Sequence, residues 1–154
     1  MGLLDRHKKP GGFRRLVNEM ETTPPSKRDK LLESLRAEDF SFIEDVRRCM
    51  FKFEDFANID DLVMCEIVFT LAKEPKTIAI ALYHAPEDLA KKFKKNLSHP
   101  QLMGLREEES MLSQVTVAQQ MSARFRIIEK ARALQSEGRI VLKPYDSKYP
   151  EEMK

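Results

Sequence analysis

The chain has 154 residues, of which 42% are hydrophobic and 34% are charged, and this predicts one main core built from helices with solvated faces. The 27 Lys and Arg residues nearly balance the 25 Asp and Glu residues, so whole-molecule attraction to nucleic acid is not expected. No segment approaches the roughly 18 consecutive apolar residues of a membrane span. We therefore expect a cytoplasmic protein that binds no nucleic acid and does not insert directly into a membrane.

The N-terminal third predicts a basic arm and three helices. Residues 1–10 are rich in Lys and Arg and precede Gly11 and Gly12, a composition typical of a flexible segment. Beyond them, apolar side chains recur at helical spacing. The predicted helices cover residues 13–20, 26–37 and 40–50. A capping box from Ser26 to Asp29 is the expected start of the second helix.

A fourth helix is predicted directly after Asp60 and Asp61, whose carboxylates suit the positive end of a helix dipole. The following run, residues 62–72, is apolar nearly all round apart from Glu66. Such a helix usually lies at the centre of a domain. We therefore expect this helix and its Cys65 to be buried. Cys49 lies in another apolar segment and is also expected to be buried. Neither thiol has the spacing of a metal or redox motif.

The remaining chain predicts short helices separated by Pro and Gly, with the longest helix last. Helical spacing recurs in three segments, residues 75–83, 86–97 and 100–112. Thr116 and Gln119 then form a capping box for a helix that Gly138 ends, with a predicted apolar stripe from Val117 to Leu134. Residues 139–142 are the one strand-like stretch. We expect residues 143–154 to be a flexible tail.

Residue types needed for catalysis or cofactor binding are scattered. The glycines form no phosphate-binding loop and the histidines have no metal-ligand spacing, so no cofactor, metal site or catalytic residue is predicted. The carboxylate clusters, such as Glu54 with Asp55, more often cap or solvate helices than act as general acids. An enzyme is the third hypothesis. It would gain support if His84, Cys65 and a carboxylate shared a pocket.

One ordered set of motifs resembles a known family. The string from Met50 to Asp55, Met-Phe-Lys-Phe-Glu-Asp, followed by Asp60 and Asp61, is similar to the C-terminal region of the flagellar motor switch protein FliG family. Shorter matching strings keep the family's order. They include Gly11-Gly12, Glu38-Asp39, Lys94-Lys95-Asn96-Leu97-Ser98, Leu105-Arg106-Glu107-Glu108 and Ser136-Glu137-Gly138-Arg139-Ile140-Val141. The resemblance covers roughly residues 11–142.

The resemblance implies an all-α fold, a right-handed, armadillo-like stack of short helices with a C-terminal helical bundle over residues 11–142. It also implies a non-catalytic protein-interaction module, a component or accessory of the flagellar motor switch complex that serves motility, torque or direction switching. The expected partners are other switch-ring proteins or FliG-like subunits, at the cytoplasmic face of the flagellar basal body. The alternative is a stand-alone armadillo-like adaptor that has lost the motor role.

The partner-binding residues that the resemblance implies lie in the first motif and in the helix after it. They are Phe53, Glu54, Asp55, Asp60, Asp61 and Glu66. By position, the helix that starts at Asp60 corresponds to the family's torque helix, but Leu62 replaces a basic residue, and Val63, Met64, Ile67 and Phe69 replace other polar and basic positions. A helix this apolar is buried or covers a partner through a hydrophobic face, so stator cytoplasmic loops are the less favoured partner.

Overall fold

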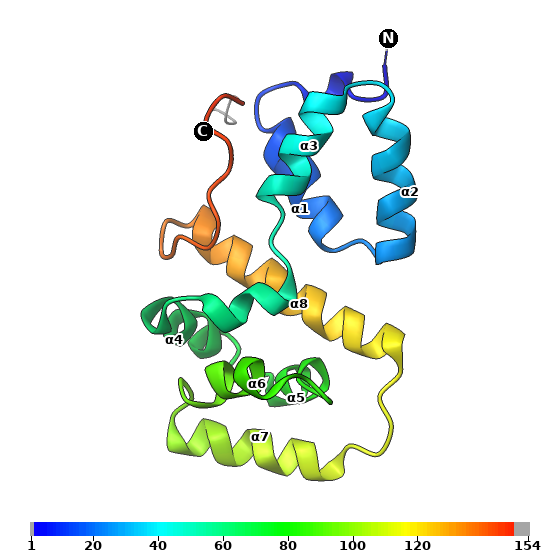
Figure 1. Cartoon of the computed structure of the whole chain (residues 1–154). Coiled ribbons are helices and arrows are strands. Elements are labelled where there is room, and N and C mark those ends of the chain that lie inside the picture. Colours follow the sequence, from blue (N-terminus) through cyan, green and yellow to red (C-terminus); the bar gives the residue numbers. More distant parts are fainter. Residues whose placement is uncertain (1, 150–154) are drawn as a thin grey trace. The chain divides into compact units, whose positions relative to one another are not determined.

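The computed structural model describes residues 2–149, and within that range the chain is all-helical with no strand. The all-α prediction is confirmed. The length predicts one main core, whereas the chain forms two compact units. Residues 1–51 and 143–154 make up the first, here called the terminal unit because it contains both chain ends, and residues 52–142 make up the central unit. Figure 1 shows the helices of both units.

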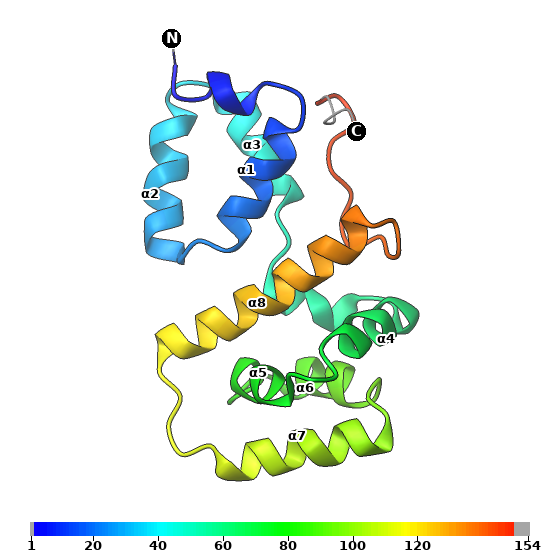
Figure 2. The same ribbon diagram turned by 180° about the vertical axis from the view of Figure 1, so that it is seen from behind.

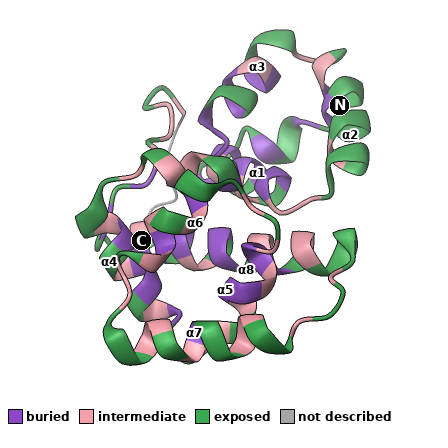
Figure 3. Ribbon diagram, turned by 60° about the horizontal axis from the view of Figure 1, so that its bottom comes forward, coloured by how far each residue is buried: buried purple, intermediate pink, exposed green. Residues whose placement is uncertain are grey.

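Three helices and one short 3-10 helix form the terminal unit. They are η1 (Asp5–His7), α1 (Gly12–Glu21), α2 (Pro25–Arg36) and α3 (Phe40–Cys49), which confirms the three helices predicted in this region. Asp39 caps α3 by accepting a hydrogen bond from the Phe42 N–H at 3.1 Å. Helix α2 instead begins at Pro25 with no side-chain cap, so the predicted Ser26 capping box is wrong. Figure 3 shows α2 mostly exposed and α1 largely buried.

Both ends of the described chain contact the core of the terminal unit. Leu4 is fully buried in it, and the Glu38 carboxylate accepts hydrogen bonds from the Leu3 and Leu4 N–H groups. Tyr145 and Tyr149 pack against the same cluster from the other end of the chain. The sequence predicts flexible segments at residues 1–10 and 143–154, and their flexibility stays a prediction. Residue 1 and residues 150–154 lie outside the part of the chain that the structure describes. Short polar stretches with isolated apolar residues have no periodicity from which the packing of Leu4, Tyr145 and Tyr149 can be inferred.

The central unit consists of six helical elements. They are η2 (Phe53–Asn58), α4 (Asp61–Thr70), α5 (Pro75–Ala81), α6 (Glu87–Lys94), α7 (His99–Met111) and α8 (Val117–Ser136). Helix α5 packs against both α7 and α8, while α4 and η2 contact α6 and α8, as the view from behind also shows (Figure 2). Phe53, Phe56 and Phe93 form an aromatic cluster with ring centroids 5.3 to 5.6 Å apart.

The ends of α8 show where sequence patterns succeed and fail. The Thr116 capping box is present as predicted, and Gly138 adopts a φ of +77° just after the helix, a conformation that favours glycine. The predicted stripe is wrong at Val117, which is largely exposed. Residues 139–142 form no strand. Their alternation is real, because Ile140 and Leu142 are buried and Val141 is exposed, but alternating burial alone does not create a ladder.

Candidate partner-binding surface

Helix α4 is buried on one face and exposed on the other. Asp60 caps it by accepting a hydrogen bond from the Leu62 N–H at 2.8 Å. The buried face consists of Met64, Ile67, Val68 and, at the helix end, Leu71. On the opposite side Leu62 is 79% exposed and Phe69 is 70% exposed, with Cys65 also exposed.

The prediction that this helix is buried is therefore wrong for its outer face. The prediction of a buried Cys65 is also wrong, whereas Cys49 is buried as predicted. When a helix is apolar nearly all round, its sequence gives no sign of which side faces the core. Leu62, Cys65 and Phe69 lie three and four residues apart, which places them on one side of the helix. We call these three residues the α4 face.

Asp61 lies beside the α4 face within a cluster of donors from α6 and the residues after it. Its carboxylate oxygens lie 3.2 Å from the Nζ atoms of Lys92 and Lys95 and 3.2 Å from the Asn96 Nδ2. The hydrogen bond from Asn96 is the largest cause that lowers the pKa of Asp61, to about 2, and the two lysines act in the same direction. Asp61 is therefore negatively charged at neutral pH, with its charge balanced inside the chain.

The other two carboxylates of α4 also have partners within the chain. Glu66 forms an ion pair with Arg139, Oε2 to Nη2 at 2.7 Å, and Asp60 is the helix cap. These exposed pairs are individually weak and are screened by salt. With these carboxylates paired, the exposed apolar side chains of Leu62 and Phe69 are the projecting feature of α4.

The three predicted site residues in η2 have packing roles. Phe53 is buried in the aromatic cluster, and the Arg124 guanidinium lies 4.7 Å from the centre of its ring. Arg124 also approaches Glu54, Nη1 to Oε1 at 3.7 Å. Asp55 accepts a hydrogen bond from the Lys52 N–H at 2.9 Å. The Phe-Glu-Asp motif thus holds η2 against α6 and α8, and of the six predicted residues only Asp60, Asp61 and Glu66 share α4.

Several residues of this surface were not predicted. Lys92, Lys95 and Asn96 all reach Asp61. Their spacing of three and four residues is the signal that puts them on one side of α6 and of the turn that follows its end at Lys94. Nothing local to Arg139 indicates its pairing with α4, because the two positions are far apart in sequence. The family resemblance marks Leu62 and Phe69 as replacements of polar or basic residues, but their exposure follows only from the structure.

The residues considered for nucleophilic chemistry have other neighbours. The Cys65 thiol donates to the Asn96 Oδ1 at 3.2 Å, and the His84 ring lies 4.2 Å from the Tyr83 ring, centroid to centroid. Within residues 2–149 no group of three or more His, Cys, Asp or Glu side chains is arranged to hold a metal ion. Across the same residues, no helix combines the length and apolar character needed to cross a bilayer.

The fold and the α4 face define the class of this molecule as an all-α protein of short helices that presents an apolar helix face to solvent. The family model of the FliG C-terminal domain matches residues 33–142. The chain therefore belongs to the FliG C-terminal domain family, and the resemblance seen in its motifs is confirmed.

Individual relatives agree with this assignment. The flagellar motor switch protein FliG of Aquifex aeolicus is 31% identical over 121 residues, which cover 79% of this chain and 36% of that protein. FliG of Thermotoga maritima is 28% identical over 138 residues, covering 87% and 39%. The chain thus spans well under half the length of these relatives.

Solved structures give the same result. FliG residues 86–343 from H. pylori superpose with a TM-score of 0.65 at 25% identity, covering 87% of this chain and 62% of that one. The structure of full-length FliG from Aquifex aeolicus gives a TM-score of 0.55 at 28% identity, covering 86% and 41%.

Proposed function

We propose that this chain is a non-catalytic component or accessory of the flagellar motor switch complex and that it acts by binding other proteins. The observation that carries the proposal is the family match over residues 33–142. The relatives with curated names are flagellar motor switch proteins. The proposed location is the cytoplasmic face of the flagellar basal body, where a switch-ring protein or a FliG-like subunit is the partner.

The α4 face is the proposed contact. Burying a large apolar side chain such as Leu62 or Phe69 contributes roughly 1.5–3 kcal/mol, and an apolar helix face is commonly received by a groove on a partner. Asp61 and Glu66 flank this face with their charges already balanced. The complex should therefore form mainly by apolar burial, and its affinity should depend only weakly on salt.

The lack of free charge on α4 also bears on which partner is favoured. A stator loop recognised by charge would have to compete with Lys92, Lys95 and Arg139 for the carboxylates of α4. A switch-ring partner with an apolar groove faces no such competition. The same feature supports the second candidate, a helical adaptor that keeps the fold and uses the α4 face for a partner outside the motor.

Affinity capture of the tagged chain from its native cells tests both candidates. The informative variant is Leu62→Ser with Phe69→Ser, and its matched control is Met103→Ser with Met111→Ser, which alters two exposed apolar residues on α7. We expect the wild type and the α7 control to enrich switch proteins and the α4 variant to lose them.

Three results would count against these proposals. Enrichment of proteins unrelated to motility, lost in the same α4 variant, would support the adaptor and reject the motor role. Switch proteins retained by the α4 variant would show that the contact lies elsewhere. A strain that lacks the chain and swims and switches normally would argue against any motor function.

A further inference from the structure

A second surface lies in the terminal unit, where residues 143–149 pack along α1 and α3. This segment follows the region matched by the family model, which ends at residue 142. It contains the sequence Tyr-Asp-Ser-Lys-Tyr at residues 145–149 and has no helix or strand. We call the surface of α1 and α3 that receives it the α1/α3 groove, defined by Phe13, Asn18, Phe42, Asp45 and Arg48.

Tyr149 is the aromatic anchor of the segment. Its ring stacks on Phe13 with the centroids 4.1 Å apart and meets Phe42 edge-on at 5.1 Å. Stacked and edge-on rings of this kind add to the stabilisation that apolar burial provides. The Tyr149 hydroxyl donates a hydrogen bond to the Asp45 carboxylate. The groove thus recognises both the flat face of an aromatic ring and a hydroxyl at its tip.

The charges of the groove match those of the segment. Asp45 is buried in α3 and accepts an ion pair from the Lys148 Nζ at 2.8 Å. Arg48, one turn later, pairs with Asp146 at 2.6 Å. A buried carboxylate needs partners, and hydrogen bonds from Lys148 and Tyr149 lower the pKa of Asp45. The acidic Asp45 of the groove therefore pairs with the basic Lys148 of the segment. The basic Arg48 of the groove pairs with the acidic Asp146.

A second aromatic contact fixes the other end of the segment. The Tyr145 hydroxyl donates to the Asn18 Oδ1 at 2.7 Å, and the Arg14 guanidinium lies 4.7 Å from the centre of the same ring. The contacts at residues 145, 146, 148 and 149 are all made by side chains. Residues 146–149 form a turn, in which the Tyr149 N–H donates to the Asp146 carbonyl at 3.3 Å. Separate positions on the groove thus meet separate side chains of a turn.

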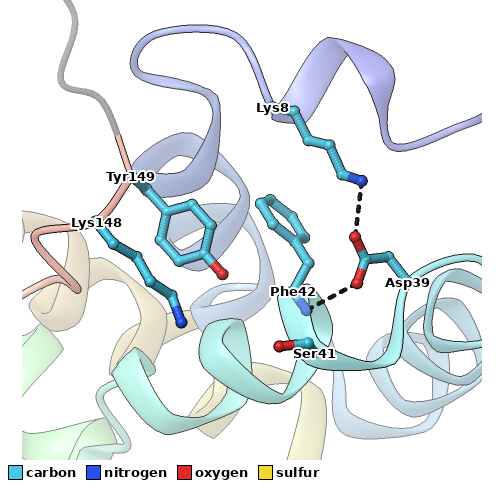
Figure 4. Close-up of a pocket in the computed structure, with 6 residues that line it drawn as sticks. All are labelled: Lys8, Asp39, Ser41, Phe42, Lys148 and Tyr149. Carbon is cyan, nitrogen blue, oxygen red and sulfur yellow. Dashed lines mark hydrogen bonds and ion pairs between the residues drawn. The ribbon is translucent and has the colours of Figure 1, made fainter.

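A pocket of about 400 Å³ lies beside Tyr149 (Figure 4). Lys8, Asp39 and Ser41 line it together with Phe42, Lys148 and Tyr149. The figure shows the Lys8 side chain directed at Asp39, and their ion pair measures 2.7 Å. The residues around the second tyrosine of the peptide thus include both polar and charged groups.

We propose that the α1/α3 groove is a recognition site for a short turn-forming peptide of a protein partner, with the pattern Tyr-Asp-any-Lys-Tyr, and that residues 143–149 are its built-in competitor. Because the segment is tethered to the groove it occupies, its effective concentration is on the order of millimolar. A partner peptide must exceed that concentration or bind more tightly to displace the segment. This inference goes beyond the motor proposal and does not depend on it.

The test begins with the full chain, with a protease site inserted between Lys143 and the exposed Pro144 and cut after folding. A fluorescent peptide of residues 144–149 is then titrated against the cut and the uncut protein. We expect the peptide to bind the cut protein at least about tenfold more tightly, because cutting removes the tether that favours the resident segment. A peptide with Ser in place of Tyr149 should bind at least about tenfold more weakly.

Variants of the groove give the matched comparison. Asp45→Asn should weaken peptide binding to the cut protein by about tenfold or more, since it removes the charge that faces Lys148. Glu44→Gln is the control, because the neighbouring carboxylate faces Arg36 at 3.2 Å and should leave peptide binding unchanged. The altered peptide keeps the test informative if Asp45→Asn fails to fold.

Four results would overturn the proposal. The first is that the cut protein binds no peptide, and the second is that it binds the peptide equally well before and after cutting. The third is a loss of helical circular dichroism when the segment leaves, which would make the segment part of the core. Finally, dimerisation of the uncut chain that Tyr149→Ser abolishes would assign the groove to a second copy of this chain.

Discussion

The same substitution at two adjacent residues of α4 should change the free energy of unfolding by very different amounts. Val68 is 1% exposed and Phe69 is 70% exposed. Val68→Asp removes a buried valine, which costs roughly 1.5–3 kcal/mol, and places a carboxyl group among apolar neighbours, which costs several kcal/mol more unless the group is protonated. We expect the central unit to lose about 4 kcal/mol or more of unfolding free energy at neutral pH.

Phe69→Asp is the matched control, with the same new side chain one position along the helix. It replaces a solvated ring by a solvated carboxylate, so the change should stay within about 1 kcal/mol. Urea unfolding followed by far-ultraviolet circular dichroism measures both variants, and the shift of the midpoint at unchanged slope gives the difference.

The pH dependence of the Val68→Asp variant provides a second check. Burial raises the pKa of the new carboxyl group above its unfolded value, so the folded state binds more protons. The penalty should therefore be smallest below the unfolded pKa of about 3.9 and grow as the pH rises through the folded pKa. A Val68→Asp chain as stable as Phe69→Asp at neutral pH would refute the burial of this face.

Three further outcomes follow from other parts of the central unit and from the two thiols. NMR should show the Asp61 carboxyl titrating near pH 2. Because its folded pKa is depressed below the ordinary value of 3.8, its pairing stabilises the folded chain above pH 3.8, and this stabilisation is lost as the pH falls toward 2. A maleimide should label Cys65 but not Cys49 in the native protein, as mass spectrometry can show, and labelling of both would contradict the burial of Cys49. Phe93→Ala should cost about 3–5 kcal/mol by urea unfolding, whereas Met103→Ala on the exposed side of α7 should stay within about 0.5 kcal/mol.

Periodicity, helped by capping residues at several helix ends, was enough to predict the α-helices, although not the two 3-10 helices. Helix α8 follows from the Thr116 capping box and Gly138, and α3 from the spacing of its apolar residues. These are local signals, and the structure obeys them because capping and helical spacing act within a few residues. The family could also be predicted, since an ordered set of motifs carries information that no single motif has.

The candidate site was harder to predict because its features depend on contacts distant in sequence. Which side of α4 faces the core is decided by its packing against α6 and α8. The role of Asp61 in partner binding stays a prediction, and the donors that balance its charge lie on and just after α6. The position of Tyr149 against Phe13 is a contact between opposite ends of the chain, and no local pattern encodes such a contact.

The two surfaces differ in the physics that would select a partner. On α4 the carboxylates are balanced within the chain and Leu62 and Phe69 project, so selection depends on shape and apolar area. In the α1/α3 groove, Asp45 and Arg48 pair with each other and each also pairs with the segment, Asp45 with Lys148 and Arg48 with Asp146, so selection depends on the order of charges along a peptide. Raising the salt concentration should therefore weaken peptide binding to the α1/α3 groove more than protein binding to the α4 face. Equal salt dependence at the two surfaces would mean that charge also governs recognition by α4.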